Sequence, residues 1–295
     1  MTRYRIIHRT TYVYSDTVSS SYGRGYLTPR ELPHQHLRSH RINVEPTPSD
    51  QSSGYDGYGN TDAYFHVTTA HRQLVVTSES TVELSPPASL GDRLGEPWEA
   101  ARPLDAGGHF AVEFQLDLAP PEITSEVRAY AAVSFPPGRP LGEAIEDLNG
   151  RIFTDFTYRS GSTTVSTRVA DVLRAGSGVC QDFARLAIAC LRSVGLAGRY
   201  VSGYLSTDPP PGKERMIGVD ATHAWVGVWV SEDLWLEFDP TNDQFVDERY
   251  ITVAWGRDYA DVPPLRGVIF TDAKESTIAV SVDVAPLQEG GTIRA

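Results

Sequence analysis

An α+β protein is predicted by the way apolar residues are spaced along the chain. Residues 1 to about 85 alternate between apolar and polar side chains in short runs that proline interrupts, as strands and turns do. From about residue 121 the apolar residues recur with the period of a helix. Three strand-like runs follow the last helical segment, and side chains alternate between faces in the last two. We therefore expect an N-terminal β-sandwich-like domain, followed by a core of helices and antiparallel strands.

Four segments follow from these patterns. Residues 1–85 form the N-terminal β domain, and residues 86–120, rich in Pro, Gly and Ala without a clear period, form a connecting region. Residues 121–270 form the core, and residues 271–295 form a C-terminal strand and tail. The run STIAVSVDVAP, residues 276–286, alternates strictly and has no partner nearby in the sequence. We expect it to return to the N-terminal β domain.

Composition excludes several classes of function. The chain has 295 residues, 40% of them hydrophobic, which is enough for one large domain or two smaller ones. Its 26 basic and 38 acidic residues give a net charge of −12, which argues against a nucleic-acid partner. No apolar run is long enough to cross a bilayer, so no membrane partner is expected. The N-terminal run MTRYRIIHRTTYVYS has no apolar signal core, which argues against export.

A cysteine stands at an unusual place in GSGVCQDFARLAIACLRSVG, residues 176–195. Cys180 follows a glycine-rich turn and begins an apparent amphipathic helix that Gly195 ends. The free N–H groups and the dipole of a helix start stabilise a thiolate and an oxyanion. Cys190 lies about 15 Å further along this helix, on its apolar face, so the two thiols should not pair. Free thiols favour a cytoplasmic location.

Two strands after this helix bring a histidine and an aspartate together. A hairpin that turns at residues 231–233 places His223 of THAWVGVWV opposite Asp239 of LWLEFDPT, to within one residue. Each of the three residues has an ordinary structural explanation when taken alone. Together they match nucleophilic catalysis, in which a thiolate attacks, an imidazole moves the proton and a carboxylate orients the imidazole.

The segments that carry this triad resemble the catalytic core of the transglutaminase-like superfamily of cysteine acyl-transfer enzymes. They are TTVSTRVADVLRAGSGVCQDFARLAIACLRSVGLAGRYVSGYL, THAWVGVWV and LWLEFDPTND. GRDYADVPPLRG, YLTPRELPHQHLRSHRINVEPTP and YDGYGNTDAYFHV resemble parts of its bacterial subgroup. The resemblance implies a papain-like core in which a helix bearing the cysteine packs on an antiparallel sheet. It assigns the nucleophile to Cys180, the base to His223 and the orienting carboxylate to Asp239.

Other residues are weaker candidates for the site. Tyr158, upstream of the nucleophile, is a candidate oxyanion donor, and Gln181 is a further oxyanion or substrate candidate. Trp225, two residues from His223 on the same strand face, is a candidate wall of the acyl channel. Arg185 stands where the family pattern tends to have histidine, so we expect it to modulate the site without forming it.

No metal or other cofactor is expected. The spacing of His34, His36 and His40 could suit a metal, but no cysteine or carboxylate cluster completes the set, so a solvated loop is the preferred interpretation. Nothing in the sequence resembles the calcium loop that animal-type transglutaminases use.

The expected activity is cysteine-dependent acyl transfer through a thioester on Cys180. Hydrolysis of a peptide, isopeptide or amide bond is preferred, which makes the partner a peptide or protein substrate. Transamidation, as in a protein-glutamine gamma-glutamyltransferase, is the alternative, because the same triad serves both reactions. A non-catalytic peptide-binding module is a further alternative. The oligomeric state stays open.

Overall fold

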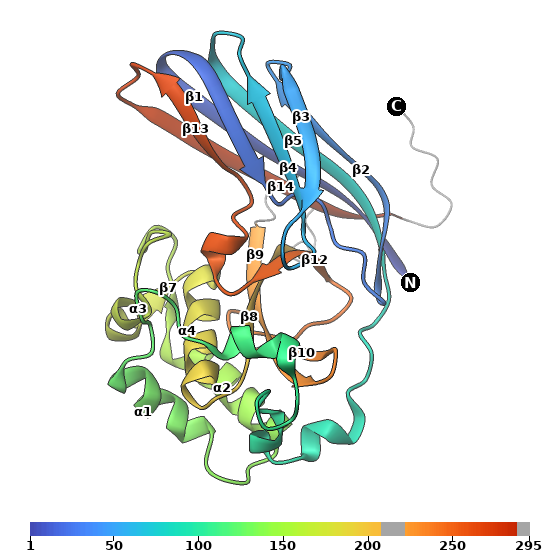
Figure 1. The fold of residues 1–295 in the computed structure, drawn as a ribbon, viewed down its shortest axis with the longest axis vertical. Helices are drawn as coiled ribbons and strands as arrows, with labels where there is room; N and C mark the ends of the chain where they lie inside the picture. The colour runs from blue at the N-terminus through green and yellow to red at the C-terminus, as the bar shows by residue number, and fades with distance from the viewer. Residues whose placement is uncertain (208–221, 288–295) are drawn as a thin grey trace, which may run out of the picture.

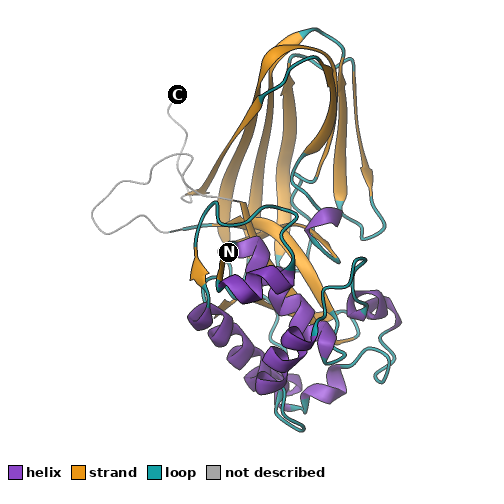
Figure 2. Ribbon diagram, turned by 90° about the vertical axis from the view of Figure 1, so that its left-hand side faces the viewer, coloured by secondary structure: helices purple, strands orange, loops and turns teal. Residues whose placement is uncertain are grey.

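The computed structural model describes residues 1–207 and 222–287, and it confirms the α+β fold class (Figure 1). A long-stranded antiparallel sheet forms one lobe, and a helical layer on a second antiparallel sheet forms the other. The helices gather on one side of the second sheet (Figure 2). Within the described residues, no helix has the length and apolar character that crossing a membrane requires.

The N-terminal lobe is one curled sheet of seven strands among the described residues. Its central strand, β1, pairs with β5 and β14 along its first half and with β4 and β13 along its second half. The expected β-sandwich-like domain is thus one sheet whose long strands bend through irregular register near residues 13–18. The strands of this sheet are β1 (Thr2–Gly25), β2 (Gln35–Glu45), β3 (Asp50–Tyr55), β4 (Thr61–Val67), β5 (His71–Leu84), β13 (Arg266–Thr271) and β14 (Ser276–Leu287).

Two strands from the last part of the described chain, β13 and β14, complete this sheet. β14 pairs with β1 from Arg3↔Leu287 to Tyr14↔Ser276, and β13 continues the same row with Val18↔Thr271 to Arg24↔Arg266. β13 therefore belongs to the N-terminal sheet, so the core ends before residue 266 and not at 270 as expected. Both hydrogen bonds and sterics favour the pairing of β13 with β1. A Cβ on Gly267 would lie 2.5 Å from the carbonyl oxygen of Tyr22, so only glycine allows this close pairing.

The connecting region, residues 86–120, holds short 3₁₀ helices that bury aromatic side chains against the core. Its frequent prolines and glycines interrupt any helical periodicity, so the apolar pattern does not predict these turns. Trp98 is 5% exposed and donates its indole N–H to the carbonyl of Pro136. The 3₁₀ helices are η1 (Gly91–Gly95), η2 (Trp98–Ala101) and η3 (His109–Gln115), and η4 (Tyr259–Asp261) lies later in the chain.

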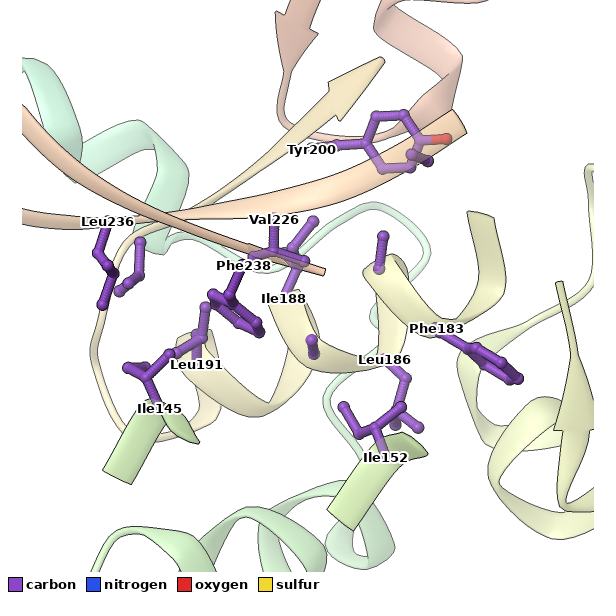
Figure 3. Packing of buried hydrophobic residues seen from close by; sticks show 14 of the residues in the cluster. Ile145, Ile152, Phe183, Leu186, Ile188, Leu191, Tyr200, Val226, Leu236 and Phe238 are labelled. Atoms are coloured by element: carbon purple, nitrogen blue, oxygen red, sulfur yellow. The ribbon is translucent and has the colours of Figure 1, made fainter. Parts of the chain in front are cut away.

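The core places one helix between other helices and a sheet. α4 contacts α1, α2 and α3 on one side and β8 and β9 on the other. In Figure 3, Ile145 and Ile152 of α2 approach it from the helical side, and Val226 and Phe238 approach it from the sheet. α4 is therefore buried from residue 182 to residue 192, well beyond the single apolar face expected. The helices are α1 (Ser125–Ser134), α2 (Leu141–Asp155), α3 (Val169–Ala175) and α4 (Cys180–Ser193).

The core sheet has the strand order β11-β10-β9-β8-β12. Its strands are β8 (Gly198–Leu205), β9 (Thr222–Ser231), β10 (Leu234–Asp239), β11 (Gln244–Phe245) and β12 (Tyr250–Gly256). β6 (Thr157–Tyr158) and β7 (Ser177–Gly178) form a separate parallel pair just before α4.

Two amides of the N-terminal lobe bind the outer edge of the core sheet. Gln35, fully buried, donates to the carbonyl of Thr252 (2.7 Å) and accepts from its N–H (2.8 Å). Asn60, also fully buried, does the same at Trp255 (2.8 and 2.9 Å). Each side chain thus takes the place that a neighbouring strand would fill beside β12.

Candidate active site

Cys180 is held at the first turn of α4 by the segment before it. The Asp182 carboxylate, 1% exposed, accepts from the Val179 N–H (2.9 Å) and from the Thr163 hydroxyl (2.6 Å). A Cβ on Gly178 would lie 2.8 Å from the Asp182 side chain, so glycine is needed where the chain turns into the helix. The Cys180 thiol is partly exposed, as a nucleophile must be.

His223 and Asp239 form the second part of the site. His223 Nε2 lies 2.6 Å from Asp239 Oδ2, and the carboxylate is fully buried. Because Asp239 engages Nε2, the ring nitrogen left to face a substrate or a nucleophile is Nδ1. The Cys180 side chain interacts with the imidazole as well, and it favours the charged form of the ring. The three residues expected from the sequence are therefore brought together.

The strand register that joins them differs from the expected one. Asp239 does not lie directly opposite His223; the pairing Phe238↔Val226 places it opposite Trp225. The cause is a two-residue turn, with Glu232 at φ 46°, followed by an irregularity between Leu234 and Trp235. His223 and Asp239 meet along the diagonal of the strand pair, which is within reach of an imidazole.

Opposing effects set the proton affinities of the pair. Burial lowers the pKa of His223, but the hydrogen bonds with Asp239 and Cys180, and their negative charges, raise that pKa to about 10. Burial raises the pKa of Asp239, but His223, Asn242 and Tyr250 hold the pKa of this carboxyl below its ordinary value. The imidazolium and the carboxylate are therefore the stable forms at neutral pH.

This geometry and the sequence agree on a family. Residues 4–83 match the bacterial transglutaminase-like N-terminal region, and residues 131–240 match the transglutaminase-like superfamily. The chain belongs to the transglutaminase-like superfamily. An uncharacterized protein of Mycobacterium tuberculosis strain H37Rv is 61% identical over 301 residues, covering 99% of this chain and 95% of the relative.

Two further likenesses bear on this transglutaminase-like chain. A solved structure of a candidate cysteine protease from Cytophaga hutchinsonii has a TM-score of 0.77 at 20% identity, covering 99% of this chain and 92% of that one. This likeness shows the fold. A protein-glutamine gamma-glutamyltransferase of Pseudomonas aeruginosa is 36% identical over 66 residues, covering 22% of this chain and 10% of the relative. The family and the fold support cysteine-dependent catalysis in general terms.

Asp239 of the transglutaminase-like site has partners that sequence reasoning missed. Its carboxylate accepts from the Asn242 amide (2.6 Å), the Tyr250 hydroxyl (2.7 Å) and the Thr241 N–H (2.8 Å). Asn242 follows the aspartate in FDPTND, and this DPTN turn was the available signal. Tyr250 comes from β12, two strands away from β9, and no local pattern predicts its contact.

Trp225 does not wall an open channel, contrary to expectation. Its side chain is fully buried and donates its indole N–H to Glu237 (2.9 Å). Its ring centroid lies 6.2 Å from that of His223 and 5.3 Å from that of Tyr250. The reason is Gly203, which pairs with His223 and has no side chain: a Cβ there would lie 2.5 Å from the Trp225 ring. Trp225 supports the imidazole from within the protein.

Tyr158 and Gln181 both lie beside Cys180. Tyr158 pairs with Gly178 in the short parallel ladder, is 55% exposed and packs edge-on against Phe183. Burial raises the pKa of the Tyr158 phenol, and the Cys180 charge raises it further, so its hydroxyl keeps its proton. Gln181 donates only a long bond, 3.4 Å, to the Val165 carbonyl.

Arg185 stands apart from the triad contacts. Its guanidinium, 9% exposed, bonds Asp258 (2.8 Å), Glu122 (3.2 Å) and the Thr167 carbonyl (2.6 Å). Glu122 in turn accepts from Arg168 (2.8 Å). These bonds tie α4 to the segments around it, so Arg185 anchors the helix that carries the nucleophile.

The remaining cysteine and histidines have separate environments. Cys190 is fully buried, and burial raises the pKa of its thiol to about 12, which makes it inert. His36 and His40 lie on β2, not on a solvated loop as expected. His36 pairs with Glu31 (2.6 Å), and His40 bonds Thr28 and Ser80 (both 2.9 Å). Among the described residues, no group of three or more His, Cys, Asp or Glu side chains is arranged to hold a metal ion.

Proposed function

We propose that this protein hydrolyses a peptide, isopeptide or amide bond through a thioester on Cys180. The observation that carries the proposal is the hydrogen bond between His223 and the fully buried Asp239, on an imidazole whose pKa the Cys180 side chain also raises. A thiol, an imidazole and a carboxylate in this order are the parts that covalent acyl transfer requires.

The reaction proceeds in two balanced steps. The Cys180 thiolate attacks the carbonyl carbon, and the carbonyl oxygen becomes an oxyanion beside the N–H groups of the first turn of α4. The C–N bond breaks as the His223 imidazolium gives its proton to the departing amine, which leaves a thioester. Water then attacks the thioester, His223 takes the proton of the water, and the carboxylic acid leaves as the thiolate is restored.

Tyr158 is the proposed second oxyanion donor. Its exposed, protonated hydroxyl lies beside the nucleophile, on the strand that pairs with Gly178. Tyr158→Phe removes this hydroxyl and should lower kcat more than it raises KM, because the hydroxyl acts in the transition state. An unchanged kcat would exclude this role.

Transamidation is the second candidate reaction, and the likeness to a protein-glutamine gamma-glutamyltransferase favours it. An amine would then replace water in the second step. Incubation of a peptide library with the protein, read by mass spectrometry with and without a primary amine, separates the two. New carboxyl termini or deamidated glutamines indicate hydrolysis, and a mass increase equal to the amine minus ammonia or water indicates transfer. Cys180→Ala is the control.

A peptide-binding module without catalysis is tested by alkylation. If His223 withdraws the thiol proton, iodoacetamide labels Cys180 at pH 6 far faster than it labels a cysteine in an unstructured peptide, whose thiol has a pKa near 8.5. His223→Ala should abolish the difference. Equal labelling in the unaltered protein would favour a binding module.

We further propose a cytoplasmic location, because a nucleophilic thiol stays reduced there. Cell fractionation tests this location.

A further inference from the structure

The outer edge of Ser276–Ser281, the first half of β14, is an unprotected strand edge in the described part of the chain. In the described part of the chain, β14 pairs with β1 alone, so along Ser276–Ser281 every second backbone N–H and C=O points away from the sheet. All six of these residues are exposed. None of them is charged, and none is proline. Strand edges that stay unpaired usually carry such features to prevent association.

Two apolar side chains on this strand face the core side of the sheet without being covered. Ile278 pairs with Tyr12 and Val280 with Thr10, so both continue the row that leads to Val282, which is 1% exposed. Yet Ile278 is 60% exposed and Val280 is 51% exposed. Side chains of this size at core-facing positions are normally buried.

The opposite edge of the same sheet is built differently. β2 carries Arg38 and Arg41, which form ion pairs with Glu83 and Glu79 of β5. β3 is short and polar and begins with Asp50. Since one edge is charged and the other is apolar and uncharged, the difference identifies β14 as the edge suited to a partner.

We propose that a second copy of this chain adds its own β14 to this edge, antiparallel to the first, and so forms a symmetric dimer. A strand that meets itself about a two-fold axis is the simplest self-complementary interface. The register centred on Ala279 places Ile278 of each copy opposite Val280 of the other, which covers both side chains. A charged partner finds no opposite charge on Ser276–Ser281, whereas a second copy presents the same uncharged strip.

Salt dependence follows from the net charge. Two copies that each carry −12 repel one another, so screening by salt should strengthen the dimer. Sedimentation velocity of the full chain over a wide concentration range, at low and high salt, should show a monomer–dimer equilibrium that salt shifts toward the dimer. A monomer under all conditions would overturn the proposal, and so would a dimer that salt dissociates.

Matched variants locate the interface. Ile278→Lys and Val280→Lys should each weaken dimerisation on the order of 100-fold, because a charge would be buried at a paired strand. Val268→Lys, at a residue of β13 that is 61% exposed, should leave dimerisation unchanged. Circular dichroism of every variant checks that the fold is retained. Dimers that persist in both β14 variants would overturn the proposal.

Cross-linking tests the register. In the Cys180→Ser background, where the remaining Cys190 is fully buried, Ala279→Cys should form a disulfide between copies. Ser281→Cys should not, because the two thiols would be about 13 Å apart along the strands, at 3.3 Å per residue. Cross-linking of Ser281→Cys in place of Ala279→Cys would overturn the register. None of these tests depends on the proposed hydrolysis.

Discussion

Asp239 holds its charge inside the protein because four donors surround it. His223, Asn242, Tyr250 and the backbone N–H of Thr241 all donate to its two oxygens, at 2.6 to 2.8 Å. A buried carboxylate without such partners would be neutral instead. Its function therefore depends on Thr241 and Asn242 of one turn and on Tyr250 of a distant strand, and not on His223 alone.

Asp239→Asn should lower kcat/KM by up to about 10⁴-fold while preserving the fold, because an amide does not stabilise the imidazolium or fix its tautomer. Asp247→Asn, at a carboxylate in the loop before β12 whose side chain is 37% exposed, is the control and should change the rate little. His223→Ala should be at least as damaging, and the double variant should be no worse than the more damaging single one. Multiplicative losses would show that Asp239 acts elsewhere.

The elevated pKa of His223 gives stability a defined dependence on pH. Folding raises this pKa from about 6.5 to about 10, so the folded state binds the proton more tightly than the unfolded one. The resulting stabilisation is fully present below pH 6.5 and is lost as pH rises toward 10. The difference in Tm between the unaltered protein and His223→Gln should therefore shrink between pH 6 and pH 10. A difference that grows over this range would contradict the assigned pKa.

Among the strands, β8 shows how one missing side chain shapes the site. Gly203 leaves room for the Trp225 ring. The Tyr250 hydroxyl of β12 donates to Asp239 of β10, although β8 and β9 lie between these two strands in the sheet. Gly203→Ala would place a Cβ 2.1 Å from the Ile251 carbonyl oxygen and 2.5 Å from the Trp225 ring. We expect a marked loss of thermal stability and of activity together.

Gly57→Ala is the control for this change, since a Cβ at Gly57 meets nothing within 4 Å. Thermal melting and alkylation of Cys180 by iodoacetamide measure the two effects separately. If Gly203→Ala melted like Gly57→Ala, the packing of Trp225 under His223 would not require a glycine.

The elements that could be predicted are those whose pattern is local. The run GRYVSGYL coincides with β8, and the helix that starts at Cys180 is α4, because periodicity and capping act over a few residues. The expected partner of Asp239 across β9 and β10 was wrong by two residues, since the positive φ of Glu232 and the irregularity after Leu234 have no clear signal. Tyr250 was missed because its contact with Asp239 depends on how strands far apart in the sequence are ordered.

At the scale of the whole molecule, the two lobes are joined by buried amides. Gln35→Ala would leave the N–H of Thr252 without its partner inside the protein, at about 1–3 kcal/mol, while the C=O of Thr252 would keep the bond from the Arg30 N–H. We expect a loss of unfolding free energy of that order in chemical denaturation, with a smaller effect from the exposed Gln73→Ala. Equal effects of the two changes would contradict the role of Gln35 at the β12 edge.

The pairing of Arg3 with Leu287 has a consequence for how the protein is made. On the ribosome β1 emerges before β4 and β5 and can pair early with them, but its other neighbours, β13 and β14, emerge only after the core. At about 5–20 residues per second, β1 stays half-paired for about 10 to 40 s while the core is synthesised. During that time the newly made chain presents an open strand to its surroundings. This is a natural point for a chaperone to act, and for two nascent chains on one messenger to exchange strands.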